Sequence, residues 1–206
     1  GRGEPVRALL WCNGEKPSDR VLTGLVEEAI LFGVDGGADK AAESGFQVTE
    51  VLGDLDSISN DWMGEITELA DQSSSDLAKS LILLAHRGFK EVDVVGCGGG
   101  SSSHHFGNWA ALCEAPIGIT IRLHHEDSIT HRIYSEDDTT ELQIGGGTRF
   151  SVFALSACKS VRIEGARWNL YESPLSLSTA GLHNISQRES VSIGADGILA
   201  VIVDRA

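Results

Sequence analysis

Ile-Leu-Phe-Gly-Val-Asp-Gly-Gly-Ala-Asp, residues 30–39, joins a short apolar run to an acidic loop that contains two glycines. The run from Ile30 to Val34 has the length and composition of a buried strand, and the amphipathic stretch from Gly37 to Ser44 predicts a helix. A strand that turns directly into a helix is the repeating unit of a parallel sheet covered by helices. These residues therefore predict an α/β fold.

The same alternation continues on both sides of this segment. The other predicted strands are Val6 to Cys12, Val48 to Leu52 and Glu91 to Val95, and the other predicted helices are Ser18 to Ala29, Asn60 to Ala70, Asp76 to Arg87 and Ser103 to Cys113. Such alternation predicts a mostly parallel sheet with helices on both faces.

After Pro116 the helical period is lost, and short runs separated by turn residues follow. The predicted strands are Ile119 to His124, Ile129 to Tyr134, Thr140 to Ile144, Phe150 to Ala154, Ser160 to Glu164, Ser190 to Ile193 and Ile198 to Val203. Seven short strands with glycine turns are typical of a small antiparallel sandwich or barrel. We therefore expect an α/β domain over residues 1–118 and an all-β domain over residues 119–206.

Composition limits the classes of function. The chain has 206 residues, of which 41% are hydrophobic and 22% charged, which is enough to bury a core and excludes intrinsic disorder. With 16 Lys and Arg against 30 Asp and Glu, the net charge of -14 argues against a nucleic-acid partner. No apolar run approaches the roughly 20 residues of a membrane span, and no leader opens the sequence. We expect a cytoplasmic protein without a membrane partner.

Two acidic loops follow predicted strands of the first domain. Asp35 and Gly36 come directly after Val34, and Asp54 and Asp56 come just after Leu52. Ligands of open parallel sheets bind at the carboxyl ends of the strands, and carboxylate oxygens suit Mg²⁺. A turn or a helix N-cap explains either loop alone, but two such loops at neighbouring strand ends favour a metal site.

A third polar run, residues 71–79, leads into a predicted helix. Its structural interpretation is a serine N-cap with Asp76 at the positive end of the helix and Lys79 on a solvated face. Its functional interpretation is that Asp76 adds a carboxylate to the metal cluster while Lys79, one turn later, faces a phosphate. The local sequence is compatible with both.

A glycine run, residues 96–100, lies between a predicted strand and a predicted helix. Its backbone amides, together with the helix N-terminus, could form a phosphate nest, although a flexible turn is an equal alternative. The run lacks the Gly-Lys-Ser or Gly-Lys-Thr of a P-loop. Acidic loops and a glycine nest together indicate a fold outside the P-loop group that handles a metal-bound polyphosphate.

The order of these motifs resembles that of the thiamine pyrophosphokinase family, over nearly the whole chain. The segments that carry the resemblance are Asp35-Gly36-Gly37-Ala38-Asp39, Gly53-Asp54-Leu55-Asp56-Ser57, Asp71-Gln72 through Asp76 and Lys79, the glycine run with His104 and Asn108, Gly165 through Trp168 to Leu170, and Gly181-Leu182-His183-Asn184. The resemblance implies pyrophosphoryl transfer from Mg-ATP to thiamine, giving thiamine diphosphate and AMP. It also implies an α/β nucleotide domain, a β-sandwich thiamine domain, and a homodimer with shared active sites.

The resemblance also implies roles for individual residues. The catalytic set is Asp54, Asp56, Asp76 and Lys79, of which the three aspartates hold magnesium with Asp35 nearby. The residues implied to face ATP are Asp35, Gly36, Gly99, Gly100, Ser101, His104 and Asn108. The residues implied to bind the acceptor are Gln72, Trp168 from the other subunit, His183 and Asn184. An indole face suits a cationic thiazolium, although a core tryptophan is the structural alternative for Trp168.

The sequence departs from the family pattern around the phosphates and the acceptor. Ser101 and Ser103 stand where the family has arginine and aspartate, and His183 and Ile185 stand where it has serine and often glutamate. A serine hydroxyl cannot replace the two charge-assisted bonds that an arginine makes to phosphate. Three hypotheses therefore stay open: an active thiamine pyrophosphokinase, a pyrophosphokinase for another heterocyclic alcohol such as a hydroxymethylpterin, and a catalytically weak nucleotide- or thiamine-binding protein.

Overall fold

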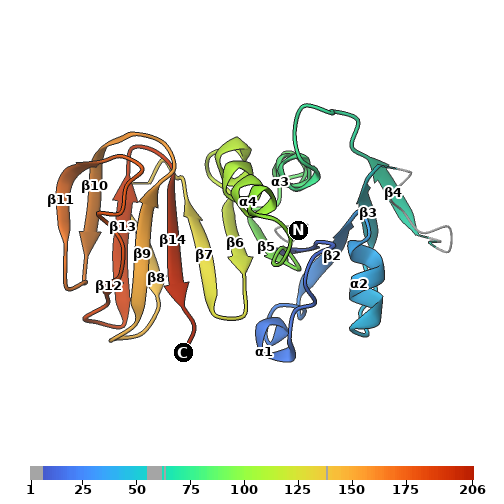
Figure 1. The fold of residues 1–206 in the computed structure, drawn as a ribbon, viewed down its shortest axis with the longest axis horizontal. Coiled ribbons are helices and arrows are strands. Elements are labelled where there is room, and N and C mark those ends of the chain that lie inside the picture. The colour runs from blue at the N-terminus through green and yellow to red at the C-terminus, as the bar shows by residue number, and fades with distance from the viewer. Residues whose placement is uncertain (1–6, 55–61, 63, 138) are drawn as a thin grey trace, which may run out of the picture. The chain divides into compact units, whose positions relative to one another are not determined.

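The computed structural model describes residues 7–54, 62, 64–137 and 139–206 (Figure 1). Asp56 lies outside the described residues. The chain divides into two compact units, of which the first ends at Glu126 and the second runs from Asp127 to Ala206.

Unit 1 contains a parallel sheet with the strand order β6-β5-β1-β2-β3-β4. Its strands are β1 (Arg7–Trp11), β2 (Ala29–Val34), β3 (Glu50–Gly53), β4 (Glu65–Glu68), β5 (Glu91–Val95) and β6 (Thr120–His124). The chain winds outward from β1 through β2 and β3, and then returns to the other side of β1 at β5. The topological switch point, where open parallel sheets bind their ligands, therefore lies between β1 and β5.

Helices cover both faces of this sheet. They are α1 (Asp19–Leu22), α2 (Gly37–Glu43), α3 (Asp76–His86) and α4 (Ser102–Glu114). Val21 of α1 and Ala41 of α2 pack with Leu9 and Trp11 of β1 in one apolar cluster. In Figure 1, α3 and α4 lie together on the opposite side of the sheet from α1 and α2. The predicted doubly wound arrangement is confirmed for this unit.

A buried ion cluster joins three strands of unit 1. Asp93 of β5 is fully buried, and its carboxylate accepts hydrogen bonds from Arg7 (2.9 Å) and from Nε of Arg122 (2.7 Å). Nε2 of His124 lies 2.6 Å from the same carboxylate. Burial alone raises the pKa of Asp93, but the hydrogen bonds and charges of His124 and Arg122 outweigh it and hold this pKa far below its usual range.

Unit 2 is a sandwich of two antiparallel sheets, with the orders β12-β9-β14-β7 and β11-β10-β13-β8. Its strands are β7 (Ser128–Ile133), β8 (Thr140–Gln143), β9 (Arg149–Ala154), β10 (Cys158–Glu164), β11 (Leu170–Leu175), β12 (Asn184–Ile185), β13 (Ser190–Ala195) and β14 (Leu199–Asp204). Phe150 and Val201 from one sheet pack against Val161 and Ile193 from the other. The core therefore lies between the sheets, as alternating apolar residues require.

Two predicted elements are wrong in type or partner. The strand at Ile119 to His124, expected to open the all-β domain, is β6 and pairs in parallel with β5, because α4 carries the chain back across the sheet as in other βαβ units. The division between the compact units falls between Glu126 and Asp127, after β6. Within the predicted helix Asn60 to Ala70, residues 65–68 form the edge strand β4, whose Glu65 and Glu68 are exposed. Charges of this kind protect sheet edges from further pairing.

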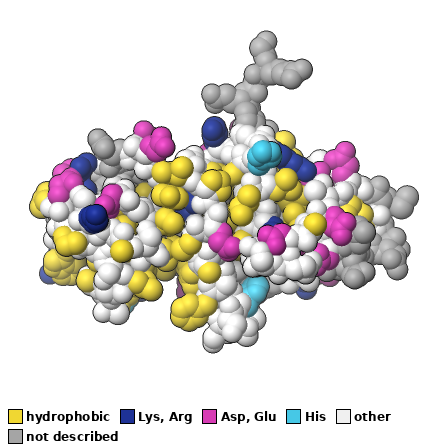
Figure 2. All heavy atoms as spheres, turned by 90° about the horizontal axis from the view of Figure 1, so that it is seen from above, with side chains coloured by type: hydrophobic (Ala, Val, Ile, Leu, Met, Phe, Trp, Pro, Cys, Tyr) yellow, Lys and Arg dark blue, Asp and Glu magenta, His cyan; other side chains and the backbone are white. Residues whose placement is uncertain are grey.

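One predicted helix is longer than the helix in the structure. Only Asp19–Leu22 of the predicted helix Ser18 to Ala29 is helical, because Gly24 takes a left-handed conformation with φ +80° just after it. Strands β11 and β12 were not predicted. No helix in the described part of the chain is long and apolar enough to cross a membrane. Figure 2 shows Asp and Glu side chains spread over the visible face, with Lys and Arg scattered among them, as the excess of acids requires.

Candidate functional site

A pocket of about 380 Å³ lies at the carboxyl ends of the unit 1 strands, at the switch point. It is formed by the loops after β1, β2 and β5 and by the first turns of α3 and α4. Its lining residues are Cys12, Asn13, Gly14, Val34, Asp35, Ser75, Asp76, Leu77, Cys97, Ser103, His104, Gly107 and Asn108. The pocket therefore stands where the fold class places its ligands.

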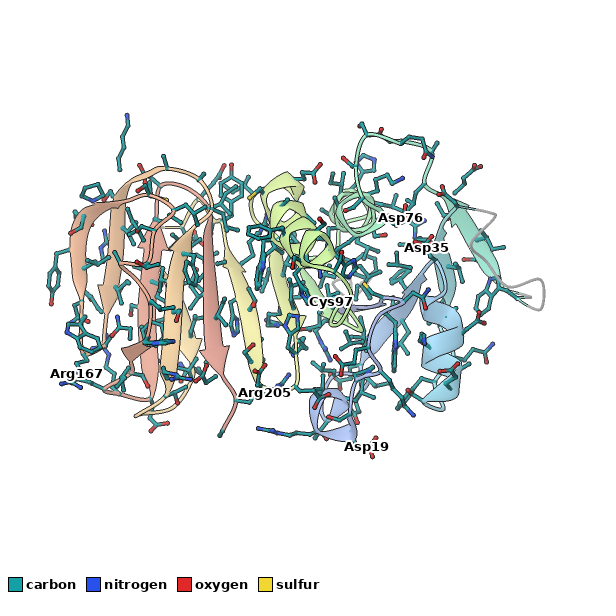
Figure 3. The ribbon with its side chains drawn as sticks, in the orientation of Figure 1. Asp19, Asp35, Asp76, Cys97, Arg167 and Arg205 are labelled. Atoms are coloured by element: carbon teal, nitrogen blue, oxygen red, sulfur yellow. The ribbon has the colours of Figure 1, made fainter. Side chains whose placement is uncertain are left out.

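Asp35 and Asp76 face each other in this pocket from β2 and α3 (Figure 3). Asp35 has a left-handed backbone, with φ +52°, and its N–H donates to the carbonyl of Leu52 at the end of β3. Its Oδ1 is buried without a hydrogen-bond partner among the described residues. A Cβ at Gly53 would lie 2.1 Å from this oxygen, so glycine is needed there. One oxygen of this carboxylate is therefore buried with no hydrogen-bond donor among the described residues.

The pKa values of the two carboxyls are shifted in opposite directions. Burial raises the pKa of Asp35 to about 7, and its hydrogen bond with Asp76 and the negative charges of Asp76 and Asp54 act in the same direction. The hydrogen bond with Asp35, and after it the contact with Lys79, lower the pKa of Asp76. Neighbouring carboxyls whose pKa values are shifted apart are a usual sign of a functional site.

This pair fits a hard divalent cation, because it offers oxygen ligands and an oxygen without a partner. Asp54 follows β3, and its backbone N–H donates toward Asp35. In the part of the chain that the structure describes, no group of three His, Cys, Asp or Glu side chains is close enough to hold a metal ion. The described residues thus bring two carboxylates together at the pocket and place Asp54 beside them, while the predicted ligand Asp56 lies outside that part.

Lys79 is within bonding distance of Asp76 but does not line the pocket. Its Nζ lies 3.2 Å from Asp76 Oδ1 and donates to the carbonyl of Leu69 at 3.1 Å and to the carbonyl of Asp71. Gln72, the expected acceptor-binding residue, is exposed in the turn that follows Asp71. That turn is fixed by Asp71 Oδ1, which accepts hydrogen bonds from the N–H and the hydroxyl of Ser73.

The glycine run forms a tight connection from β5 to α4. Gly99 and Gly100 are left-handed, with φ +75° and +83°, and Ser101 is the N-cap of α4, accepting from the N–H of His104. Asn108 is buried, and its Nδ2 donates to the carbonyl of Cys97, so it holds the run from the side of the helix. His104, Ser103 and Asn108 line the pocket, whereas Gly36, Gly99, Gly100 and Ser101 are not among its lining residues.

Sequence reasoning missed the loop after β1. Cys12, Asn13 and Gly14 line the pocket, and the N–H of Gly14 donates to the carbonyl of Gly96 across the switch point. A Cβ at Gly14 would lie 2.3 Å from Gly96 O, and one at Gly96 would lie 2.5 Å from Cys12 O. The missed signal was an Asn-Gly pair directly after the first strand, at the same sheet edge as the acidic loops.

A second pocket, of about 550 Å³, lies in unit 2 and is mostly apolar. Its lining residues include Trp168, Leu170, Leu175, Leu182, His183 and Asn184. Trp168 is 55% exposed, which excludes the plain core role, and the guanidinium of Arg167 lies 4.8 Å from its ring centroid. Asn184 is buried and binds the backbone of Trp168 through both amide atoms, at 2.7 and 3.1 Å. The sequence-predicted residues Trp168, His183 and Asn184 therefore meet at one pocket.

The parallel sheet, the helices on both faces and the pocket at the switch point define a doubly wound α/β protein with its ligand site in the usual place. Residues 23–123 match the family described as thiamin pyrophosphokinase, catalytic domain. That segment begins just after α1 and ends within β6, and it belongs to the thiamin pyrophosphokinase family, which confirms the resemblance seen in the motifs.

Solved structures agree with the fold. Thiamine pyrophosphokinase from Bacillus subtilis has a TM-score of 0.80 at 20% identity, with 96% of this chain and 98% of that chain covered. The enzyme from Geobacillus thermodenitrificans has a TM-score of 0.78 at 19% identity, covering 97% and 98%. The enzyme from Candida albicans has a TM-score of 0.74 at 14% identity, covering 97% and 90%. No curated protein sequence matches the chain.

Proposed function

We propose that this protein is a thiamine pyrophosphokinase, which transfers a pyrophosphoryl group from Mg-ATP to thiamine and releases AMP. The observation that carries the proposal is the Asp35–Asp76 carboxyl pair at the switch-point pocket. Its support is that residues 23–123 belong to the family. In the reaction the thiamine hydroxyl oxygen bonds to the β-phosphorus of ATP, and the bond from that phosphorus to the α,β-bridging oxygen breaks, so AMP leaves.

The residues of the pocket can position this reaction. Backbone amides at the start of α4 and in the glycine run would bind phosphate oxygens. Asp35 and Asp76, with Asp54 and Asp56, would hold Mg²⁺, which when bound neutralises charge on the transferred phosphates. Trp168 and His183 would contact thiamine, and Asn184, by holding the backbone of Trp168, would orient the indole. Catalysis would then come from positioning and charge neutralisation rather than from a covalent nucleophile.

The test is incubation with Mg-ATP and thiamine while AMP is followed. AMP and thiamine diphosphate in equal amounts are expected. AMP formation with a hydroxymethylpterin but not with thiamine would show a pyrophosphokinase with another acceptor. No AMP with either, together with a melting temperature that ATP still raises, would show a binding protein.

One observation favours the binding protein as the second candidate. Among the described residues that line the switch-point pocket there is no Lys or Arg. Ser103 lines it instead, next to the N-cap Ser101, where the family pattern has charged residues. Without a fixed cation beside the phosphates, charge in the transition state would be less well stabilised, so slow turnover with retained nucleotide binding would fit this pocket.

Magnesium binding should depend on pH. Because the pKa of Asp35 is raised to about 7, a metal ion must displace a proton below that pH. We expect the Mg²⁺ affinity to rise from pH 6 to pH 8 and about one proton to be released per ion near pH 6. Calorimetry in buffers of different ionisation enthalpy measures this release. Asp35→Asn should remove the pH dependence, and a release that persists in this variant would contradict the assignment.

Trp168 should serve the acceptor rather than the nucleotide. Loss of the indole face in Trp168→Ala is expected to raise the KM for thiamine by roughly 3- to 30-fold, with the KM for ATP unchanged. Tyr171→Ala is the matched control, because Tyr171 is also exposed on unit 2 but does not line the pocket. Equal rises in both KM values would instead mark Trp168 as structural.

We also propose that the protein acts as a homodimer. Unit 2 exposes several large apolar side chains, namely Trp168, Tyr171, Leu177 and Leu182. Gathered apolar exposure of this kind usually serves an interface or a ligand. Sedimentation equilibrium across a range of concentrations tests the dimer, and a single species with the mass of one chain would contradict it.

A further inference from the structure

The ammonium group of Lys79 has an acceptor within the protein for each of its hydrogen-bond donors. An ammonium group has three N–H donors. The Nζ of Lys79 has three acceptors in reach, namely Leu69 O, Asp71 O and Asp76 Oδ1. Its side chain is only 9% exposed and is not among those lining the switch-point pocket. Lys79, which was expected to face a phosphate, thus binds groups of the protein instead.

The three acceptors belong to two parts of the site. Asp76 opens α3 and carries the carboxylate that pairs with Asp35. Leu69 and Asp71 belong to the segment between β4 and α3, and Asp71 immediately precedes Gln72. One ammonium group therefore connects the carboxylate side of the site with the loop that presents Gln72.

The rest of this loop is held by weaker, more exposed contacts. Asp71 closes a local turn on Ser73, and the hydroxyl of Ser74 donates to Glu114 of α4 at 2.7 Å. Both contacts are exposed to solvent, as is the contact from Lys79 to Asp71, whereas the contact from Lys79 to Leu69 is partly buried. Exposed contacts restrain a loop little, because water competes for the same groups. Lys79 is the main anchor of this segment.

We propose that Lys79 is a positioning residue, which fixes the Asp76 carboxylate and the Gln72 loop relative to each other. The metal ion and the acceptor are thereby held in fixed relative positions. The inference rests on the proposed function for the identity of the two ligands. It differs from the phosphate-facing role because Lys79 acts through Asp76 and through backbone carbonyls. Partners that orient a metal ligand in this way typically change metal affinity by roughly 10- to 100-fold when they are removed.

The test compares Lys79→Met with wild type and with Lys90→Met, which removes an exposed lysine from the same unit. In Lys79→Met, the half-saturating Mg²⁺ concentration is expected to rise by roughly 10- to 100-fold, the KM for thiamine to rise, and the ATP affinity measured in EDTA to stay unchanged. Amide hydrogen exchange of residues 70–75 in the ligand-free protein should become faster, and Lys90→Met should match wild type throughout.

The opposite pattern would overturn the proposal. A Lys79→Met variant that loses ATP affinity in EDTA while exchange of residues 70–75 stays slow would show a direct phosphate contact. Should this variant melt below the assay temperature, Lys79→Arg, which keeps the charge with a different donor geometry, is measured in the same way. If wild type forms no AMP from ATP and thiamine, the proposed function fails, but the exchange and Mg²⁺ measurements still decide the role of Lys79.

Discussion

Asp76→Asn should reduce AMP formation by at least about 100-fold, because a metal ion's stabilisation of phosphoryl transfer is worth several kcal/mol and each 1.4 kcal/mol is tenfold in rate. The amide carries no negative charge and is a poorer ligand for Mg²⁺. It still fits at the N-terminus of α3, where Ser75 remains the N-cap. The expected outcome is therefore a folded protein with very low turnover at any Mg²⁺ concentration.

The matched control is Asp39→Asn. Asp39 is an exposed carboxylate in the first turn of α2, in the same acidic loop region, and does not line the pocket. Steady-state rates of both variants, with circular dichroism as a check of folding, separate a site effect from a loss of net charge. Near-normal turnover in Asp76→Asn would show that catalysis does not depend on the carboxyl pair.

The largest effect on stability is expected at Asp93. Removing one member of a buried ion cluster typically costs about 3–5 kcal/mol, because the remaining charges stay buried without compensation. Asp93→Asn would leave Arg7, Arg122 and His124 around a neutral amide. Since whole domains are stable by only about 5–15 kcal/mol, unit 1 should become marginal. Urea unfolding monitored in both units measures the loss.

Asp204→Asn is the control for this prediction. The ion pair of Asp204 with Arg149 is exposed, with side chains 40% and 57% accessible, and exposed pairs contribute about 0–1 kcal/mol. Comparable destabilisation in the two variants would contradict the special role of the buried cluster.

The pH dependence of stability provides a second check on Asp93. Its pKa is lower in the folded protein than in the unfolded chain, so the contribution of this group is present at neutral pH. It is lost as the pH falls below about 4, where the unfolded carboxyl takes up its proton. Wild type should therefore lose stability steeply in acid, and Asp93→Asn should show a shallower loss.

Local patterns predicted most of the fold. Strand β5 was predicted with its observed bounds, Glu91–Val95. Helices α2 and α3 differ from prediction by one residue at the C-terminal end, and α4 differs by one residue at each end. The errors have physical reasons. The strand with which β6 pairs could not be predicted from its sequence, since parallel and antiparallel strands of this length share the same apolar pattern. The edge strand β4 is short and carries charged residues, so the alternation of apolar and polar residues typical of a strand is not evident in its sequence.

The candidate site was predicted less completely. Loop position after β2 was enough to single out Asp35, because strand ends of a parallel sheet converge. The local sequence left the role of Asp76 open, and only the resemblance to the family implied a metal ligand there. The roles of Lys79 and Asn184 could not be predicted, since their partners are backbone carbonyls or N–H groups that only the folded chain brings near. The loop after β1 was missed because Cys12 and Asn13 are not charged.

The close contact between the loops after β1 and β5, at Gly14 and Gly96, has a consequence for engineering this protein. A methyl group on Gly14 would lie 2.3 Å from the carbonyl oxygen of Gly96, and one on Gly96 would lie 2.5 Å from that of Cys12, so neither glycine tolerates a side chain. A mutant library that randomises these two loops would consist mainly of clones that do not fold. Directed evolution toward a new acceptor should instead diversify Pro174 and Ala180, which are exposed and line the pocket of unit 2.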